Sequence, residues 1–239
     1  MLEVKNLKKN FGDFQAVKGI SFSVKEGEVL GFLGPNGAGK STTMRMITGF
    51  LPPSSGTAVI CGKDIQADPV EAKKNLGYLP ESAPSYKAMT VSDFLAFIAS
   101  VRGFTGAEAA KKVEDVIVQA KIEKVRNQTI ETLSKGYRQR TCFAQAILHD
   151  PKVLIMDEPT DGLDPNQKYM VRQMIKEMAA KGKAIIISTH ILEEVDAVCN
   201  RCIVIADGEK KFDGTSDELR ALDASGKLDV VFRNLTMKA

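Results

Sequence analysis

The pattern of hydrophobic and polar positions predicts strands over the first third of the chain. Residues 20–24 alternate between apolar and polar, as in a half-buried strand, and residues 29–33 are continuously apolar, as in a strand buried on both faces. Residues 42–48 follow as a short helix that ends at Gly49, with two prolines just beyond. Further extended segments are expected at 57–61 and 77–80.

The periodicity becomes helical between residues 81 and 148. Thr90 to Asp93 and Thr105 to Glu108 both resemble capping boxes, and a helical pattern follows each of them. The second of these helices gathers its apolar positions on one face. These positions are Ala109, Val113, Val116, Ile117 and Ala120. We interpret the block as a helical insertion.

Strands and helices alternate again after this insertion. Apolar strands are predicted at 153–156 and 184–188, and a helical pattern follows each strand. The two helices are expected near 168–180 and around 191–199. A turn at Asp207-Gly208 joins two further short strands into a hairpin. Such alternation is typical of an α/β fold.

Composition limits the classes of protein to which the chain can belong. Its 239 residues suffice for a sizeable core, and 44% hydrophobic with 26% charged residues is ordinary for a globular protein. The net charge of +3 gives no basic stripe, so no nucleic-acid partner is expected. The chain shows no signal peptide and no apolar run near the roughly 18 residues that span a bilayer. We therefore expect a soluble protein that meets a membrane through a partner.

The four cysteines favour a reducing compartment. Cys199 and Cys202 form a CxxC motif, which has two interpretations. The first is a metal or redox role, but a zinc site would need a second pair of ligands nearby, and the sequence offers none. We therefore favour two ordinary buried thiols at a helix–strand junction.

A phosphate-binding loop occupies residues 34–41, where GPNGAGKS fits the pattern GxxxxGK[ST] between a predicted buried strand and a helix. Glycines let backbone N–H groups face phosphates, and a helix N-terminus attracts anions. Lys40 is expected to reach the β- and γ-phosphates, and the Ser41 hydroxyl to ligate Mg²⁺. A dinucleotide site is disfavoured because the GxGxxG spacing is absent. The expected nucleotide-binding residues are Gly34, Pro35, Asn36, Gly37, Ala38, Gly39, Lys40, Ser41 and Thr42.

Two carboxylates follow the strand expected at 153–156. Asp157 is placed to hold Mg²⁺ beside the phosphate loop, and Glu158 to polarise an attacking water as a general base. His190 follows the next strand, and we interpret it as a group that hydrogen-bonds the γ-phosphate and orients Glu158. The alternative for His190 is a helix-capping role. The catalytic candidates are therefore Lys40, Glu158 and His190.

The order of these motifs resembles the ATPase subunit of ATP-binding cassette (ABC) transporters, from Leu2 to about Leu222. The sequences that carry the resemblance are the phosphate loop, LSKGYRQR at 133–140, LIMDEP at 154–159, DGLD at 161–164 and STH at 188–190. The resemblance implies one α/β domain, a P-loop NTPase (RecA-like) core with an N-terminal antiparallel β subdomain and an inserted α-helical subdomain. The expected division is 1–80 and 149–222 for the core, 81–148 for the insertion with its signature helix, and 223–239 for a C-terminal tail.

The resemblance also implies two cassettes, identical or different, that pack head to tail around ATP and Mg²⁺. The family's signature begins Leu-Ser-Gly-Gly-Gln, where this chain reads LSKGY from Leu133 to Tyr137. Ser134 and the N–H group of Gly136 would touch the γ-phosphate in the other subunit's site, a task that suits a helix N-terminus. Ser134 can also be a plain N-cap, and the two roles are compatible.

Three further positions take their roles from the resemblance. Phe11 matches the aromatic residue that stacks on adenine, although a lone aromatic is equally a core residue. Asp164 belongs to the loop that communicates between the two sites. Glu81 stands where the family has a glutamine that senses the γ-phosphate, and a carboxylate there can ligate Mg²⁺ but repels the phosphate.

We therefore predict an ATP hydrolase that binds peripherally to the cytoplasmic face of the cell membrane and drives a separate integral membrane permease. Lys135 and Tyr137, with GYLPE and LDVVFRNLT, resemble the ABC-2-type exporter branch. The permease contact is expected just after GYLPE, at residues 82–94, where Tyr86, Met89 and Phe94 offer apolar side chains. The alternative is that several of these side chains belong to the local core. The alternatives are a soluble ABC-type ATPase that acts on nucleic acid or ribosomes, and a nucleotide-gated scaffold that scarcely hydrolyses ATP.

Overall fold

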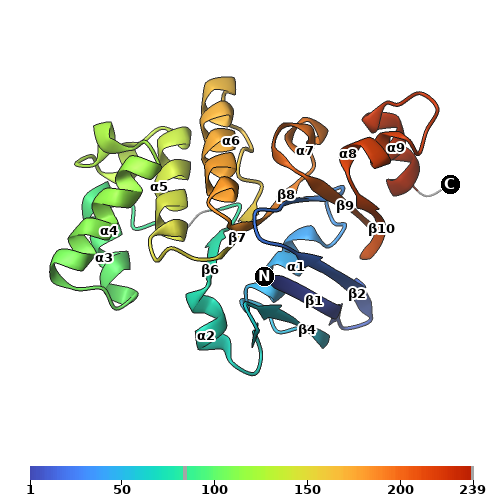
Figure 1. Ribbon diagram of the computed structural model, residues 1–239, viewed down its shortest axis with the longest axis horizontal. Helices are drawn as coiled ribbons and strands as arrows, with labels where there is room; N and C mark the ends of the chain where they lie inside the picture. The colour runs from blue at the N-terminus through green and yellow to red at the C-terminus, as the bar shows by residue number, and fades with distance from the viewer. Residues whose placement is uncertain (83–84, 238–239) are drawn as a thin grey trace.

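Two β-sheets organise the computed structural model, which describes residues 1–82 and 85–237 (Figure 1). The smaller sheet is antiparallel, with strand order β2-β1-β4-β5. The larger sheet has the order β10-β9-β3-β8-β7-β6, in which β10 alone is antiparallel to its neighbour. The strands are β1 (Leu2–Phe11), β2 (Phe14–Val24), β3 (Val29–Leu33), β4 (Ser55–Ile60), β5 (Lys63–Asp64), β6 (Leu76–Leu79), β7 (Val153–Asp157), β8 (Ala184–Thr189), β9 (Arg201–Ala206) and β10 (Glu209–Gly214).

The interior of the larger sheet is buried on both faces, as its continuous apolar sequences predict. Every residue of β3, β7 and β8 is buried. On one face, α1 (Lys40–Ile47) lies between the two sheets, where Met44 and Phe32 share a core with residues of β1 (Figure 1). On the other face, α6 (Pro165–Ala180) and α7 (Leu192–Val198) cover the sheet. A short helix, α2 (Pro69–Lys74), precedes β6.

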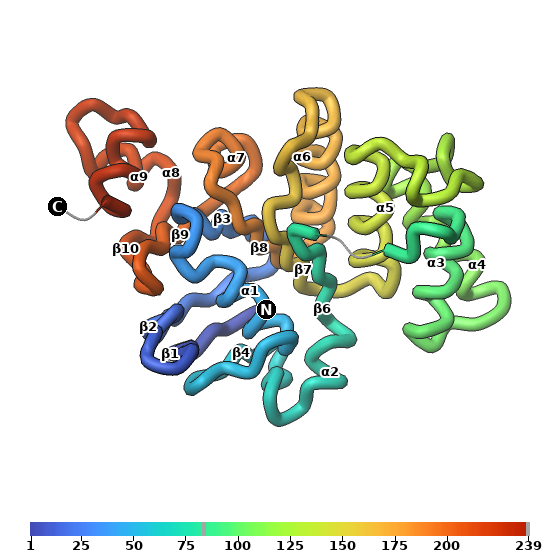
Figure 2. The backbone as a smooth tube through the Cα atoms, turned by 180° about the vertical axis from the view of Figure 1, so that it is seen from behind, coloured from blue at the N-terminus to red at the C-terminus, as the bar shows by residue number. Residues whose placement is uncertain are grey.

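The predicted helical insertion lies between β6 and β7, at the end of the molecule opposite the C-terminal helices (Figure 2). It contains α3 (Val91–Val101), α4 (Gly106–Gln119), two 3₁₀ turns (Glu123–Val125 and Ile130–Thr132) and α5 (Lys135–Ile147). The predicted apolar face of α4 packs inward, since Val113, Val116 and Ile117 are buried. Burial of this face against α3 and α5 stabilises the insertion.

The two predicted capping boxes differ in the structure. The Thr90 hydroxyl accepts a hydrogen bond of 3.2 Å from the N–H group of Asp93, so α3 has its N-cap. Thr105 precedes α4 but makes no side-chain cap bond. The prediction for Thr105 is therefore wrong, although the helix begins where the sequence placed it.

The three apolar side chains expected in the surface after GYLPE differ in their exposure. Phe94 is only 1% exposed and belongs to the core of the insertion, so its alternative as a local core residue is confirmed and a partner contact through this ring is excluded. Met89 is partly buried against the same core, and Tyr86 is exposed. Positions 83–84 of the expected surface lie outside the described residues.

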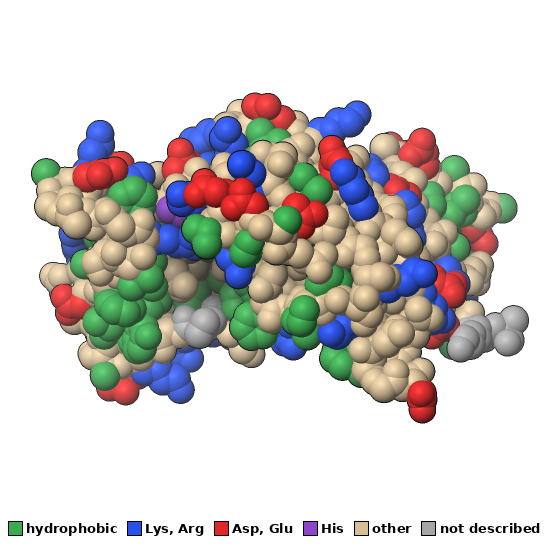
Figure 3. All heavy atoms as spheres, turned by 90° about the horizontal axis from the view of Figure 1, so that it is seen from below, with side chains coloured by type: hydrophobic (Ala, Val, Ile, Leu, Met, Phe, Trp, Pro, Cys, Tyr) green, Lys and Arg blue, Asp and Glu red, His purple; other side chains and the backbone are tan. Residues whose placement is uncertain are grey.

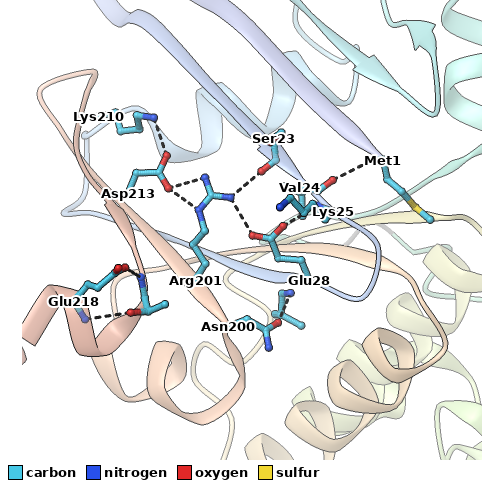
Figure 4. Close-up of polar contacts among 12 residues, drawn as sticks. Met1, Ser23, Val24, Lys25, Glu28, Asn200, Arg201, Lys210, Asp213 and Glu218 are labelled. Carbon is cyan, nitrogen blue, oxygen red and sulfur yellow. Dashed lines mark hydrogen bonds and ion pairs between the residues drawn. The ribbon is translucent and has the colours of Figure 1, made fainter.

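Arg201 ties the edge of the larger sheet to the smaller sheet (Figure 4). Its guanidinium donates hydrogen bonds to Asp213 at 2.6 Å, to Glu28 at 3.0 Å and to the carbonyl oxygen of Ser23 at 3.0 Å. Lys210 donates to the same Asp213 at 2.8 Å. Because the cation has partners on several segments, the β9–β10 hairpin is held against the end of β2.

The segment expected as a C-terminal tail contains a packed helix. α9 (Leu228–Thr236) follows α8 (Ser216–Arg220) and places Val231 in a buried cluster with Val204 of β9. This cluster holds the C-terminal helices against the sheet. Neither α9 nor any other helix within 1–82 and 85–237 has the length and hydrophobicity that crossing a membrane requires.

The four cysteines are all free thiols. Burial raises the pKa of Cys202 to about 12 and raises that of Cys199 as well, so both thiols stay protonated near neutral pH. In the part of the chain that the structure describes, no cluster of three or more His, Cys, Asp or Glu side chains is arranged to hold a metal ion. The CxxC motif therefore has the surroundings of buried thiols.

Candidate nucleotide-binding site

A cleft of about 610 Å³ lies between the β1–β2 hairpin and the start of α1. Neighbouring parallel strands supply it, because their carboxyl ends meet at one edge of the sheet. β3 leads into the phosphate loop, β7 into Glu158, β8 into His190 and β6 into Glu81. The lining residues are Phe11, Phe14, Ala16, Pro35, Asn36, Gly37, Gly39, Lys40, Ser41, Thr42, Glu81, Glu158, Asp161 and His190. Most residues that the sequence singled out are thus brought together.

The phosphate loop takes a course that requires glycine. Gly37 and Gly39 have φ angles of 81° and 100°, in the left-handed region. A Cβ atom on Gly39 would lie 2.6 Å from the carbonyl oxygen of Ala16, so the loop packs directly on β2. Around Gly37 there is open space. This shape fits a cradle in which backbone N–H groups approach a phosphate.

Lys40 begins α1, and its side chain is almost fully buried. Its ammonium donates hydrogen bonds to the carbonyl oxygens of Gly34 at 2.7 Å and Pro35 at 3.2 Å. It also lies 3.9 Å from Glu158 Oε1. Burial lowers the pKa of Lys40, whereas the nearby carboxylates, Glu158 foremost, raise it. The cation is therefore held inside the cleft by acceptors that phosphate oxygens can replace.

Asp157 and Ser41 place two oxygen atoms side by side next to the cleft. Ser41 Oγ donates to Asp157 Oδ1 at 3.3 Å, and Ser188 Oγ donates to the same carboxylate oxygen. Asp157 is buried at the end of β7. A hydroxyl beside one carboxylate fits Mg²⁺, which binds few protein groups and keeps water and phosphate oxygens as its other ligands. Glu81 lines the same cleft, and its role as a Mg²⁺ ligand stays a prediction.

Glu158 is fixed by both its backbone and its side chain. Its φ of 48° is unusual for a residue with a side chain, and its N–H group bonds to Ser188 O at 3.1 Å and Ser188 Oγ at 3.2 Å. His190 Nδ1 lies 3.1 Å from Glu158 Oε1. The carboxylate is thus held between an imidazole and the ammonium of Lys40. This geometry suits a base that must face an attacking water.

The predicted site residues at the starts of α5 and α6 do not line this cleft. Ser134 is the N-cap of α5, accepting a hydrogen bond from the Tyr137 N–H group at 3.4 Å. Asp164 caps α6 in the same way, accepting from two N–H groups at 3.0 Å. Gly136 is buried against Gln167, where a Cβ atom would clash with the amide. The plain N-cap interpretation of Ser134 is therefore confirmed, while the roles across a dimer stay predictions.

The cleft also contains residues that the sequence reasoning did not select. Phe14 was missed because only one aromatic carried the family resemblance, although Phe14 lies three residues after Phe11. Asp161 was read only as part of a communicating loop. Ser188 lies beside the cleft, where it bonds to Asp157 and to the backbone N–H group of Glu158; it belongs to the STH motif, but the sequence reasoning gave it no role. Phe11 is 49% exposed and lines the cleft, so its alternative as a core residue is excluded.

A phosphate loop between β3 and α1, on a mainly parallel sheet, defines a P-loop nucleotide-binding protein. The family model described as ABC transporter matches residues 17–161, more than half of the chain. The chain therefore belongs to the ABC transporter family, whose ATP-binding subunits are ATPases coupled to transport. The predicted family and fold class are both confirmed.

Relatives cover almost the whole chain. The linearmycin resistance ATP-binding protein LnrL of Bacillus subtilis is 38% identical over 92% of this chain and 70% of its own length. The Nod factor export ATP-binding protein I of Ralstonia nicotianae is 36% identical over 92% and 68%, respectively. The probable multidrug ABC transporter ATP-binding protein YbhF of Escherichia coli is 35% identical over 94% of this chain and 39% of its own length. A solved structure of an ATP-binding subunit of an ABC transporter superposes with a TM-score of 0.88 at 30% identity, over 99% of this chain and 100% of that one.

Proposed function

We propose that this chain hydrolyses MgATP at the interface of a head-to-tail dimer and thereby drives a separate membrane permease. The observation that carries the proposal is the contact of 3.1 Å between His190 and Glu158, beside the buried ammonium of Lys40. A carboxylate oriented by a histidine and next to a phosphate-binding lysine is suited to deprotonate the water that attacks a phosphoryl group.

The charged and polar residues at the centre of the site have separate tasks in this proposal. Lys40 and the N–H groups of the phosphate loop hold the β- and γ-phosphates, and Lys40 exchanges its carbonyl partners for phosphate oxygens. Ser41 and Asp157 would hold Mg²⁺, which would supply positive charge to the phosphate oxygens. Glu158 accepts the proton of the attacking water. His190 keeps the Glu158 carboxylate pointed at that water.

The dimer is proposed because Ser134 and Gly136 do not line the cleft of their own chain. Ser134 and Gly136 stand at the N-terminus of α5, whose first N–H groups and dipole attract an anion. A second cassette, identical or related, would present these groups to the γ-phosphate held by Lys40. The loop that ends at Asp164 would carry the communication between the two sites.

An apolar groove supports contact with a permease. Its volume is about 550 Å³, and its lining includes Phe50, Ile98 and Val101, with Lys73 and Arg102. Figure 3 shows hydrophobic side chains gathered at the left of the face seen from below, over the inserted helices. Tyr86 extends this surface through an edge contact with Phe97, with ring centroids 5.3 Å apart. Exposed apolar surface of this kind marks a contact site for another protein.

Export is the direction of transport that the relatives' names favour. Those proteins are named for linearmycin resistance, Nod factor export and multidrug transport. We propose the ABC-2-type exporter branch for this chain, at the cytoplasmic face of the cell membrane. The division into a core of 1–80 and 149–222 with an insertion of 81–148 accompanies this proposal. The rival function on nucleic acid or ribosomes has no support from the relatives.

Purification of the tagged chain from detergent-solubilised membranes of its own cells tests the proposal. Mass spectrometry is expected to find a stoichiometric polytopic membrane protein, and the complex is expected to release phosphate from MgATP. Val101→Glu, in the groove, should abolish recovery of this partner. Val118→Glu is the matched control, because Val118 is also exposed but lies on α4. Recovery from the soluble fraction alone, with ribosomes or without a partner, would contradict the proposal.

A further inference from the structure

Two phenylalanine rings extend into the nucleotide cleft from a single hairpin. Phe11 ends β1 and Phe14 begins β2, and the strand register pairs them directly across the turn at Gly12 and Asp13. Directly paired residues of antiparallel strands have their side chains on the same face. Both rings line the cleft that contains Lys40. The hairpin therefore contributes two aromatic groups to this cleft.

The backbone holds Phe14 close to the phosphate loop. Phe14 and Ala16 lie two residues apart on β2, about 7 Å along the strand, and both line the cleft. The carbonyl of Ala16 packs against Gly39, where a Cβ atom would lie only 2.6 Å from its oxygen. The Phe14 ring also forms part of a second, smaller hollow of about 180 Å³ beside Gly37. Its position relative to the phosphate loop is therefore set by the fold.

Phe11 has one face already occupied. The Lys9 ammonium lies over this ring, 5.2 Å from its centroid, and donates a hydrogen bond of 2.7 Å to the carbonyl oxygen of Pro52. A flat ligand can therefore stack only on the other face of the Phe11 ring. The opposite face of the ligand then stays without a contact from Phe11. Phe14 is 65% exposed, more than Phe11, so its ring offers apolar surface to such a ligand.

We propose that Phe14 is a second aromatic contact for the base of bound ATP, acting together with Phe11. The inference rests on the proposed function, because it requires ATP in the cleft, and it adds a residue that recognises the base. Stacking on an aromatic ring needs only a flat face and removes apolar surface from water. Loss of one base–aromatic contact weakens nucleotide binding by about fivefold or more.

Binding of MgATP and of magnesium tripolyphosphate, compared by calorimetry on the full chain, separates base recognition from phosphate binding. Phe14→Ala is expected to weaken MgATP binding by about fivefold or more and to leave tripolyphosphate binding within about twofold. Phe14→Tyr, which keeps the ring, should restore the affinity for MgATP. Phe50→Ala is the matched control, since Phe50 is an exposed phenylalanine outside the cleft.

Three results would overturn the inference in distinguishable ways. Unchanged MgATP affinity in Phe14→Ala would show that the ring serves another contact, such as a protein partner. Equal weakening of both ligands would show that Phe14 acts through the phosphate loop. If the unaltered chain binds neither ligand, the proposed function fails first, and the inference fails with it.

The chain contains no tryptophan, which allows a second measurement. Phe14→Trp places a single indole at the proposed contact on an exposed position, where the fold tolerates a larger ring. Its fluorescence is expected to change on addition of MgATP and to stay constant on addition of tripolyphosphate. An unchanged emission with MgATP, at concentrations that calorimetry shows to be saturating, would contradict the contact.

Discussion

Lys135 forms an ion pair with Asp161, with 3.6 Å between its ammonium and the carboxylate. Lys135 lies in the first turn of α5, within the signature, and Asp161 lines the nucleotide cleft of the same chain. The end of the lysine side chain lies over Gly162, which has a φ of 61°, in the left-handed region that favours glycine. The pair thus links the signature segment to the cleft through a position where the family has glycine.

Lys135→Gln is expected to weaken MgATP binding by up to about fivefold at low salt, since exposed ion pairs contribute about 0.2–1 kcal/mol. The reason is that the substitution leaves the negative charge of Asp161 without its counter-ion, in a cleft that also contains Glu81 and Glu158. The difference should shrink at high salt, because the pair is exposed and screened. Titrations of nucleotide affinity at two salt concentrations measure this effect.

The double variant Lys135→Gln with Asp161→Asn serves as the control. It removes both charges, so it should recover most of the lost affinity. If Lys135→Gln binds MgATP as tightly as the unaltered chain at low salt, the pair has no electrostatic effect on the cleft.

Glu158→Gln is expected to reduce the turnover of MgATP by about 100-fold or more, which is the range for loss of a general base. Nucleotide affinity should stay nearly constant, because Lys40 and the phosphate loop are unchanged. An ATP-bound dimer should then accumulate, visible by light scattering at saturating MgATP. Phosphate release measures the turnover.

Glu193→Gln is the matched control for that experiment, as Glu193 is exposed at the start of α7 and does not line the cleft. It should keep full turnover. A monomer at saturating MgATP together with retained turnover in Glu158→Gln would contradict the assignment of Glu158.

His190→Ala is expected to lower the turnover while changing the affinity for MgATP only slightly. The substitution removes the contact between His190 Nδ1 and Glu158 Oε1. The Glu158 carboxylate then moves more freely and points at the water for a smaller fraction of the time. Asparagine places its amide nitrogen near the position of Nδ1, so His190→Asn should restore part of the turnover. Glutamine reaches instead toward the position of Nε2.

Steady-state phosphate release for the three variants distinguishes two roles of His190. Better rescue by asparagine than by glutamine indicates that His190 positions Glu158. Better rescue by glutamine indicates a contact with the γ-phosphate. Full turnover in His190→Ala would remove both roles.

Much of the fold and the centre of the site followed from local sequence patterns. The run at 29–33 predicted a strand buried on both faces, and β3 is such a strand, because a parallel sheet covered on both sides requires apolar residues at every position. Lys40, Asp157 and Glu158 were placed correctly beside one another because strand ends converge at one edge of the sheet.

Other features depend on packing that no local pattern contains. Phe94 on α3 is buried in the core of the insertion, although its sequence neighbours suggested a surface. Thr105 has the sequence of an N-cap, but its hydroxyl makes no cap bond. The pairing of Phe11 with Phe14 depends on the register of the β1–β2 hairpin, and the sequence pattern alone did not place a two-residue turn at Gly12 and Asp13.

The ring of His149, which no motif includes, gives the chain a predictable dependence of stability on pH. His149 Nε2 lies 2.9 Å from the carbonyl oxygen of Leu76, and the ring is largely buried. Burial, aided by the charge of Arg102, lowers the pKa of His149 from 6.5 to about 4. As the pH falls below 6.5, the unfolded chain binds a proton that the folded chain still excludes.

The free energy of unfolding is therefore expected to fall between about pH 6.5 and 4, by up to about 3 kcal/mol from this group. Below that range both states are protonated, and the loss ends. His149→Gln can keep the N–H donor to Leu76 but does not titrate, so its urea-unfolding curves should lose this part of the pH dependence. Subtracting one pH profile of the free energy of unfolding from the other removes the contribution of the carboxylates, which are the same in both chains. Parallel pH profiles for the two chains would contradict a neutral, buried His149.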